Sequence, residues 1–265
     1  MATGAVTTGW LEYRDGWWPV DGEVIEEALV TIYLNGKELA TIMCTPRDQD
    51  KLALGFLKNE GLLNSLAEVQ ELHLSRNGCC VDVWLDHGVT MPKRVIITSG
   101  CGGGVTFDDP ALGIRPLTSD LRLRPEVLFG LLNQLHYPGS LHARTRGVHA
   151  AGLADGDRLL VRVEDVGRHN TIDKLRGACM QQGITTEGRV LLATGRVSSE
   201  MLRKAALMGC PIVASRNSPT SMSIAMAEAW NITLAGYVRH GTMRVYAHPE
   251  RLGMGEPARE PVAGD

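Results

Sequence analysis

The sequence lacks the short motifs that would assign it to a common class of metalloenzyme or nucleotide-binding enzyme. It contains no Cys-x-x-Cys and no His-Glu-x-x-His, so the usual zinc-ligand spacings are missing. It also lacks a Walker A loop, a Gly-x-Gly-x-x-Gly fingerprint, and the zinc-deaminase pattern of His-x-Glu followed by Pro-Cys-x-x-Cys. We therefore expect no metal site, and a zinc-dependent nucleotide deaminase is disfavoured.

Long apolar runs and an excess of charge of one sign are also missing. No apolar stretch approaches the roughly 20 residues of a membrane helix, and Met1 to Gly16 lack the basic-then-apolar pattern of a secretory signal. The net charge of -3 over 265 residues argues against a general affinity for nucleic acid or anionic membranes. We expect a cytoplasmic protein with neither kind of partner.

Cysteine is too sparse for a disulfide framework, with six in the chain, and a reducing cytoplasm keeps thiols free. Cys44, Cys179 and Cys210 are interpreted as small core residues. The adjacent Cys79 and Cys80 would point to opposite faces of a strand, and a bridge between them would need strained geometry. We expect a structural role for both.

The first part of the chain predicts a small α+β domain. Two β-rich runs, 28–34 and 38–43, flank Asn35-Gly36, which is the strongest short signal for a hairpin. A helix from about residue 48 to Gly61 and strands over 69–75 and 80–86 follow. We place this domain at residues 23–112, and we expect disordered tails over 1–22 and 253–265.

Beyond residue 113 strands alternate with helices, which is typical of an α/β sheet with parallel strand pairs. The fold class is therefore predicted as α/β, with the second domain over 113–252. We find no internal repeat. The expected helices cover 125–135, 170–180, 199–208 and 220–230, and the expected strands cover 148–153, 159–166, 189–193, 211–214, 233–238 and 243–247.

A glycine-rich loop with one thiol ends the first domain. The residues are Thr98-Ser99-Gly100-Cys101-Gly102-Gly103-Gly104. Glycine lets a large ligand or a partner's sulfur approach the backbone closely, and successive N–H groups can stabilise a thiolate or hold a phosphate. Cys101 is therefore the candidate catalytic residue. The alternative is a connector that happens to hold a cysteine.

Three strand-to-helix loops of the second domain carry one arginine each, namely Arg168, Arg196 and Arg216. The carboxyl ends of parallel strands share one edge of a sheet, and a helix N-terminus beside an arginine is a ready phosphate site. The three arginines together predict a large anionic ligand with several phosphates.

The first of these loops, Glu164-Asp165-Val166-Gly167-Arg168-His169-Asn170, is a dense polar cluster. His169 could transfer a proton or orient a ligand near neutral pH. The alternative is structural: Asn170 caps the helix, Asp165 satisfies the turn, and His169 is exposed.

Two further segments are candidates for the same edge. His149 interrupts a small apolar strand and is interpreted either as a satisfied core group or as a ligand contact. The segment Tyr237, Val238, Arg239, His240, Gly241 and Thr242 turns between the last two predicted strands. A base could stack on Tyr237; the alternative is a hairpin turn with an exposed Arg239.

Taken in order, these motifs resemble the formate dehydrogenase accessory sulfurtransferase family. The resemblance covers roughly Leu29 to Leu252, and its motifs are Thr41-Ile42-Met43-Cys44-Thr45-Pro46, Leu54-Gly55-Phe56-Leu57 with Glu60-Gly61, Thr98-Ser99-Gly100-Cys101-Gly102, Gly147-Val148-His149-Ala150-Ala151, Glu164 to Asn170, Gly195-Arg196 with Ser199-Glu200-Met201, and Gly236-Tyr237-Val238-Arg239.

The resemblance implies a sulfur carrier that takes persulfide sulfur from a cysteine desulfurase. It would deliver this sulfur to the molybdenum or tungsten bis(molybdopterin guanine dinucleotide) cofactor before the cofactor enters formate dehydrogenase. It further implies a homodimer and a C-terminal fold similar to cytidine deaminase, without the zinc. Cys101 matches the family's persulfide cysteine, and Tyr237 to Thr242 match its cofactor-binding segment, although His240 and Thr242 stand where other residues are common.

The chain departs from the family at one position. Many members carry Cys-Gly-x-Cys, and Gly104 replaces the second cysteine here. One thiol still suffices for a persulfide, because transfer needs only a thiolate and a terminal sulfur. A cofactor-binding chaperone that moves no sulfur is the alternative function.

Overall fold

The computed structural model describes residues 3–92, 96–98, 104–106 and 113–254, with the backbone alone for 96–98 and 104–106. It is a mixed α/β fold with two main sheets, as expected from the strand and helix pattern. Cys101, the predicted boundary at residue 112 and most of the expected tail over 253–265 lie outside the described residues.

The larger sheet contains the six strands predicted for the second part of the chain. Its central strands β11, β12 and β13 are parallel, and β9, β10 and β14 flank them in antiparallel pairs. In sheet order the strands are β10 (Arg158–Asp165), β9 (His149–Asp155), β11 (Val190–Ala193), β12 (Ile212–Ser215), β13 (Thr233–Arg239) and β14 (Thr242–Ala247).

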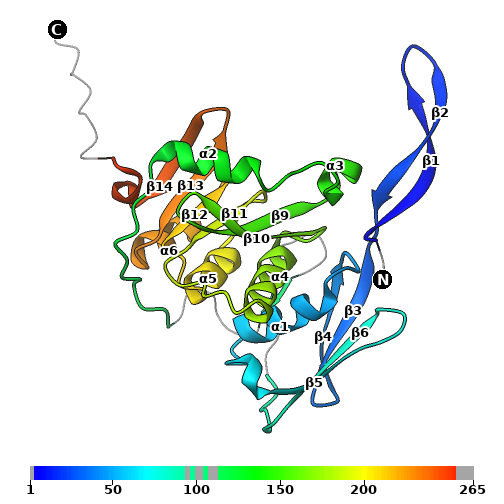
Figure 1. Cartoon of the computed structure of the whole chain (residues 1–265), viewed down its shortest axis with the longest axis horizontal. Coiled ribbons are helices and arrows are strands. Elements are labelled where there is room, and N and C mark those ends of the chain that lie inside the picture. The colour runs from blue at the N-terminus through cyan, green and yellow to red at the C-terminus, as the bar shows by residue number, and fades with distance from the viewer. Residues whose placement is uncertain (1–2, 93–95, 99–103, 107–112, 255–265) are drawn as a thin grey trace.

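Helices cover both faces of this sheet because its strands alternate apolar side chains between two cores. Leu153, Leu191 and Val213 pack on one face, and Ala154, Leu192 and Ala214 pack on the other. Figure 1 shows helices on both sides of this sheet. The first face carries α4 (Arg168–Gln181), α5 (Ser199–Leu207) and α6 (Ser221–Ala229). The second face carries α2 (Pro125–Asn133). The remaining helices of this half of the chain are α3 (Leu141–Thr145) and the short helix Pro249–Leu252.

The smaller sheet has four strands with helix α1 (Gln49–Asn59) packed on it. The predicted hairpin at Asn35-Gly36 is confirmed, and both residues take positive φ, 50° and 72°. The sheet order is β4 (Lys37–Cys44), β3 (Ala28–Leu34), β6 (Cys80–Leu85) and β5 (Val69–Leu74), with the short helix Leu66–Glu68 before β5.

Two glycines let α1 and α4 touch backbone to backbone and thereby join the two sheets. A Cβ on Gly55 would lie 1.8 Å from the Asp173 carbonyl oxygen. A Cβ on Gly177 would lie 2.0 Å from the Lys51 carbonyl oxygen. Real Cβ atoms cannot approach backbone this closely, so any side chain at either position would push the helices apart.

We expect Gly55→Ala to destabilise the fold by about 3 kcal/mol or more, because neither backbone can yield without separating the sheets. Gly130→Ala is the control, since Gly130 is exposed in α2 and its Cβ would meet nothing within 4 Å. Gly130→Ala should raise the free energy of unfolding by about 0.5–1 kcal/mol, because alanine lowers the conformational entropy of the unfolded chain and has the higher helix propensity. Urea denaturation followed by circular dichroism measures both, and equal effects would contradict the close-packing interpretation.

The expectation that residues 1–22 form a disordered tail is wrong. Strands β1 (Ala5–Tyr13) and β2 (Trp17–Ile25) pair as an antiparallel hairpin that projects from the body (Figure 1). Its base is held by Ala5 and Ile25, which pack on Leu141 and Val148. The tip carries exposed rings, with Tyr13 and Trp17 stacked edge to face at 5.3 Å between centroids. The alternating Thr, Trp and Val pattern was the missed strand signal.

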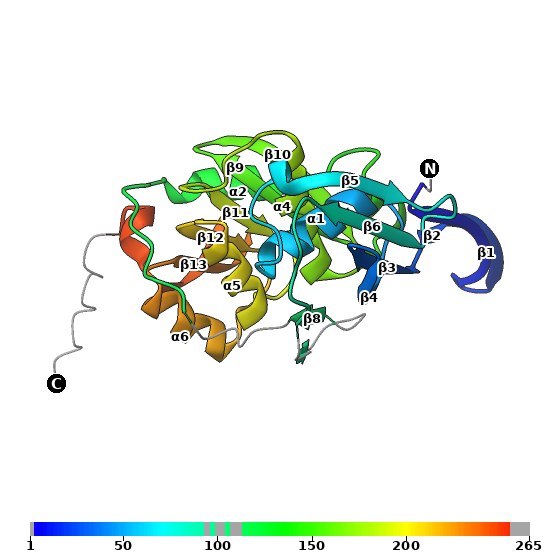
Figure 2. The ribbon, with the colours of Figure 1, turned by 90° about the horizontal axis from the view of Figure 1, so that it is seen from below.

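The glycine-rich loop is bracketed by a second small hairpin. Strands β7 (Ile96–Thr98) and β8 (Gly104–Thr106) are antiparallel, with Thr98 opposite Gly104. Strand β8 contacts β4, and Figure 2 shows the hairpin on one side of the molecule, between the two main sheets. Strand β8, which the chain forms directly after the Cys101 segment, therefore lies beside β4.

Candidate functional site

The strand order brings the predicted site loops to one edge of the larger sheet. Strand β10 runs parallel to β11, because both pair antiparallel with β9. The carboxyl ends of β10, β11, β12 and β13 therefore meet at one edge, together with His149 at the start of β9 and Thr242 at the start of β14. The arrangement expected for Arg168, Arg196, Arg216 and Tyr237 to Thr242 is confirmed.

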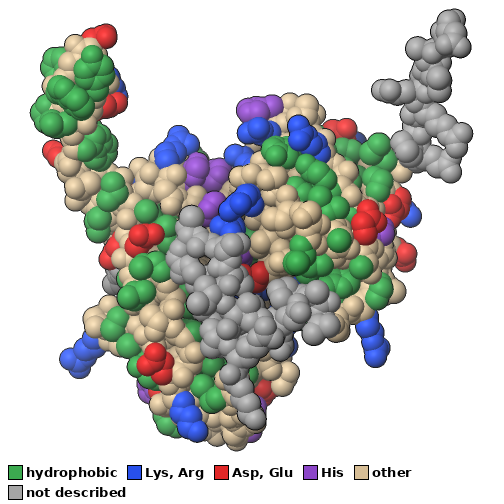
Figure 3. All heavy atoms as spheres, turned by 180° about the vertical axis from the view of Figure 1, so that it is seen from behind, with side chains coloured by type: hydrophobic (Ala, Val, Ile, Leu, Met, Phe, Trp, Pro, Cys, Tyr) green, Lys and Arg blue, Asp and Glu red, His purple; other side chains and the backbone are tan. Residues whose placement is uncertain are grey.

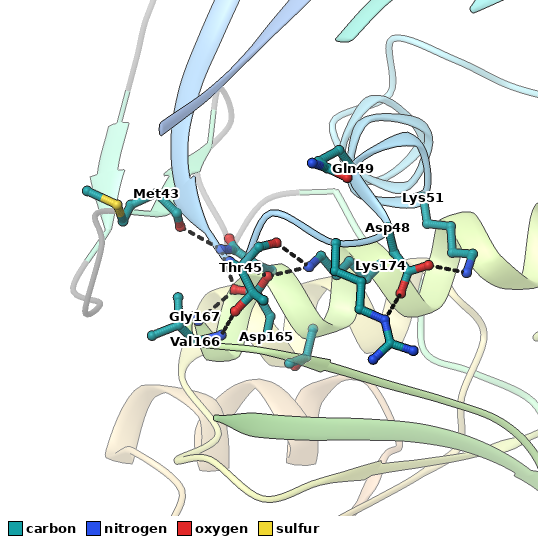
Figure 4. Close-up of polar contacts among 12 residues, drawn as sticks. Met43, Thr45, Asp48, Gln49, Lys51, Asp165, Val166, Gly167 and Lys174 are labelled. Carbon is teal, nitrogen blue, oxygen red and sulfur yellow. Dashed lines mark hydrogen bonds and ion pairs between the residues drawn. The ribbon is translucent and has the colours of Figure 1, made fainter. Parts of the chain in front are cut away.

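Asp165, at the end of β10, is fully buried and binds the small sheet to this edge (Figure 4). Its Oδ2 accepts from the Thr45 N–H at 3.2 Å and pairs with Lys174 Nζ at 2.6 Å. Its Oδ1 accepts from the Gly167 N–H at 2.7 Å and from Asn170 Nδ2 at 2.9 Å. Four donors satisfy a buried carboxylate that would otherwise be costly.

Asn170 completes this contact and does not cap the helix. Its Nδ2 also donates to the Met43 carbonyl oxygen at 2.8 Å, near the end of β4. The Thr45 hydroxyl accepts from the Val166 N–H at 3.1 Å. Glu164 is structural as well, because its carboxylate accepts from the N–H groups of Leu141 and His142 at the start of α3. Asp165 satisfies the turn, as the structural interpretation predicted, whereas its prediction that Asn170 caps the helix is wrong, because Gly167 is the N-cap of α4.

Arg168 and His149 lie side by side at the edge, against Gly195. A Cβ on Gly195 would lie 2.9 Å from Arg168 Cβ and 3.2 Å from His149 Nδ1. Arg168 is buried and His149 is partly exposed. Burial and the neighbouring Arg168 guanidinium lower the pKa of His149, so it is neutral at pH 7. Arg196, the next residue along, is exposed to solvent.

His169 is buried, whereas the structural interpretation of this loop predicted an exposed side chain. Its Nε2 lies 2.9 Å from Ser198 Oγ and 3.4 Å from Glu200 Oε2. Glu200 in turn pairs with Lys204 Nζ at 3.2 Å, and Lys204 pairs with Asp173 at 2.8 Å. Burial lowers the pKa of His169 to about 4, although Glu200 opposes the shift. His169 is therefore a neutral hydrogen-bonding group at pH 7.

This pKa predicts a loss of stability in acid. An unfolded histidine takes a proton near pH 6.5, whereas folded His169 resists it until about pH 4, so the unfolded state binds more protons in this window. We expect the free energy of unfolding to fall by about 3 kcal/mol more in the parent than in His169→Gln between pH 7 and pH 4. Urea denaturation at several pH values measures the difference. Parallel pH profiles would contradict the buried neutral histidine.

Arg216 and Arg239 line one cavity at the β12 and β13 ends of the edge. It has a volume of about 350 Å³ and is also lined by Phe129, Asn133, His240 and Gly241. The Arg216 Nη2 donates to the Leu132 carbonyl at 3.1 Å and to Asn133 Oδ1 at 3.0 Å. These bonds hold the guanidinium against the end of α2, while Arg239 and His240 are exposed. The cavity thus presents two cations to an anionic ligand.

The turn that carries Arg239 is conformationally strained. Tyr237 has φ of 53° inside a β-bulge between Gly236 and Arg239, and His240 has φ of 51°. Positive φ is costly for a side chain like tyrosine. Val238 is buried at 1 % exposure and anchors the turn in the core. The Tyr237 ring, expected to stack on a base, lies 4.4 Å from the Arg244 guanidinium carbon.

This chain is similar to known proteins over most of its length. The profile of the FdhD/NarQ family matches residues 25–253. Proteins named "Sulfur carrier protein FdhD" from Bacillus subtilis (strain 168) and Staphylococcus aureus (strain MRSA252) are 36% and 33% identical, covering 90% and 91% of this chain and 96% and 94% of their own. A solved structure, a putative formate dehydrogenase accessory protein from Desulfotalea psychrophila, has a TM-score of 0.78 at 28% identity, covering 94% of this chain and 99% of its own.

This chain belongs to the FdhD/NarQ family. The resemblance seen in the ordered motifs is thereby confirmed, and the matched region includes Cys101 and Tyr237 to Thr242. Most of the N-terminal hairpin lies before residue 25, outside the family match. The fold is shared across the aligned length, and the expected likeness to cytidine deaminase stays a prediction.

Sequence reasoning missed a pair of histidines near Arg216. His136 and His142 stack with centroids 3.7 Å apart, and Arg146 Nη1 lies 3.3 Å from His142 Nε2. Burial, with positive neighbours, lowers the pKa of His136 to about 4. Figure 3 shows histidine side chains close to basic side chains on one face of the molecule. The two histidines are six positions apart, in a segment with Pro138 and Gly139 between them, so no helical or strand periodicity predicted their contact.

The described cysteines divide into two groups. Cys44, Cys179 and Cys210 are buried core residues, as expected, and burial raises their pKa values to about 12, 11 and 12. Cys79 and Cys80 are half-buried with their Sγ atoms 3.6 Å apart. The expectation that they point to opposite faces is wrong, because Cys79 lies in the turn before β6 and is not part of the strand.

No group of three or more potential metal-ligating side chains lies together among the described residues. None of the helices in that part of the chain is long and apolar enough to cross a membrane.

Proposed function

We propose that this protein is a sulfur carrier required for formate dehydrogenase activity. Cys101 would carry a persulfide taken from a cysteine desulfurase, and the substrate that receives the sulfur would be the molybdenum or tungsten bis(molybdopterin guanine dinucleotide) cofactor before its insertion. The names of the relatives, sulfur carrier and formate dehydrogenase accessory protein, support this reaction class. The chain would act in the cytoplasm as a homodimer.

The observation that carries the proposal is the cavity lined by Arg216 and Arg239. A cofactor with guanine dinucleotide arms presents phosphates, and forked guanidinium groups bind phosphate oxygens in pairs. A cavity of about 350 Å³ accommodates one nucleotide-sized end of such a ligand. Arg168, His169, Arg196 and His149 would line the path along the same edge, with Tyr237 to Thr242 closing its far end.

The Cys101 step needs one thiolate. The Cys101 sulfur attacks the outer sulfur of the donor persulfide, a new S–S bond forms on Cys101, and the donor cysteine leaves as a thiolate. The S–S bond on Cys101 would then break, with the outer sulfur passing to the cofactor at the sulfide level, Cys101 leaving as a thiolate, and the two electrons coming from the cofactor's metal or an external thiol reductant. The paired strands β7 and β8 bring the chain on either side of Cys101 beside β4, and the end of β4 contacts Asp165 and Asn170. We expect the thiol segment to face the start of the ligand edge, because β8 directly follows this segment and lies beside β4.

Nucleotide binding tests the cavity. We expect Arg216→Ala and Arg239→Ala each to weaken binding of guanosine diphosphate at least tenfold by isothermal titration calorimetry, a loss of about 1.4 kcal/mol or more. Arg158→Ala is the control, because Arg158 is exposed at the start of β10, on the opposite edge of the sheet. Equal affinities for all four proteins would place the nucleotide elsewhere.

Complementation tests the sulfur carrier. In a strain that lacks the endogenous gene, Cys101→Ala should abolish formate dehydrogenase activity, whereas Cys79→Ser, which alters an accessible thiol far from the site loops in sequence, should retain it. If Cys101→Ala keeps full activity while Arg239→Ala loses it, the protein is a cofactor-binding chaperone that moves no sulfur. This is the alternative function suggested by Gly104 in place of the family's second cysteine.

A further inference from the structure

The turn between β5 and β6 holds two thiols in contact, outside the site described above. The Cys79 and Cys80 Sγ atoms are 3.6 Å apart, which is van der Waals contact between sulfurs. Both side chains are half-buried, so reagents in solution reach them. The three other described cysteines are buried, and burial raises their pKa values, so they are inert by comparison.

The turn orients the two sulfurs differently. Asn77 Oδ1 lies 2.9 Å from Cys79 Sγ and also accepts from the Cys79 N–H at 3.3 Å. The Ser75 hydroxyl lies 3.9 Å from Cys79 Sγ and accepts from the Cys80 N–H at 2.9 Å. These bonds position the Cys79 sulfur, and the Cys80 sulfur lies in contact with it. The turn itself is held by Gln49 Nε2, which donates to the Gly78 carbonyl oxygen at 3.3 Å.

The hydrogen bonds also divide the two thiols into an attacking and a resolving group. Hydrogen bonds from the Cys80 thiol and from Ser75 lower the pKa of Cys79. The reciprocal bond to Cys79, burial and the nearby Glu38 carboxylate raise the pKa of Cys80. Cys79 is thus the better thiolate and Cys80 holds the shared proton.

We propose that Cys79 and Cys80 form a second reactive thiol site, a vicinal dithiol that is oxidised by low-molecular-weight disulfides and closes to a Cys79–Cys80 bond. The Cys79 thiolate attacks one sulfur of the disulfide, forms a mixed disulfide and expels one thiolate. Cys80 then loses its proton to water, attacks the Cys79 sulfur and expels the second thiolate. Two protein thiols are oxidised and one external disulfide is reduced to two thiols, so electrons balance.

The short Sγ–Sγ distance favours the second step, in which Cys80 attacks the mixed disulfide on Cys79. A resolving sulfur 3.6 Å from the mixed disulfide is near attack distance before any movement. The step competes with the strain of a ring that contains one peptide bond. The site therefore acts as a reversible acceptor of oxidising equivalents, which is independent of the proposed persulfide on Cys101.

The experiment uses the full chain with Cys101→Ala, so that only Cys79 and Cys80 among the remaining thiols are accessible. After incubation with glutathione disulfide, we expect the loss of both accessible thiols, a chain mass lower by two hydrogens, and one peptide that links Cys79 to Cys80 and is restored by reductant. Cys44, Cys179 and Cys210 should stay reduced and serve as internal controls.

Two single variants separate the roles. Adding Cys80→Ser should stop the reaction at a glutathione adduct on Cys79, and adding Cys79→Ser should slow the first step at least tenfold. A stable glutathione adduct on Cys79 in the chain that keeps Cys80 would overturn the closure, and no loss of thiol at all would overturn the site. Neither outcome bears on Cys101, because that thiol is absent from every protein tested here.

Discussion

The buried carboxylate of Asp165 is the contact on which the rest of the site depends. It stands at the end of β10 with no exposed surface, and it is stable there only because Thr45, Gly167, Asn170 and Lys174 supply donors. Three of these donors belong to the large sheet and its helix α4, and one belongs to the small sheet. Removing any partner would leave a charge in a low-dielectric interior, which is far more costly than losing an ordinary hydrogen bond.

The glycine contact between α1 and α4 makes this polar junction geometrically possible. Because Gly55 and Gly177 have no Cβ, the two helices approach until backbone meets backbone. That approach buries Asp173 and Lys204 as a second ion pair, with Asn59 Nδ2 donating to Asp173 at 2.7 Å. The carboxylates of Asp173 and Glu200 raise the pKa of Lys204 against the effect of burial, so the lysine stays charged. The hydrogen bonds that Thr45 and Asn59 donate to these two buried ion pairs therefore fix how the small sheet and α1 sit beside the ligand edge.

The two ends of the edge differ in how far their side chains are buried. At β10 and β11, buried Arg168 and His169 pack against glycine and hydrogen-bonded side chains. At β12 and β13, Arg216 and the strained Tyr237–His240 turn face a cavity. Strain of this kind persists only where the surroundings hold it, here through buried Val238, and it is concentrated where ligands bind. A phosphate-bearing ligand would find its preformed cations at the second end.

Local sequence determined most of the secondary structure. Asn35-Gly36 tolerates positive φ, so the first hairpin followed from two residues, and the alternation of strands with helices predicted the shared edge that gathers Arg168, Arg196 and Arg216. The ordered motifs also indicated the family. The prediction from local sequence was wrong at residues 1–22. Their many small and polar residues were interpreted as a disordered tail, although β1 and β2 pair there.

Only the tertiary structure decided which polar residues hold the fold and which face a ligand. Asp165, Glu164 and Asn170 belong to a polar cluster whose role the sequence left open, and their partners Thr45, Met43 and Leu141 are brought to them only by packing. The same is true of the Cys79 and Cys80 contact, which depends on where β6 begins. A sequence specifies periodicity and turn chemistry locally, whereas burial and partnership depend on contacts between residues more than a hundred positions apart, such as Thr45 and Asp165.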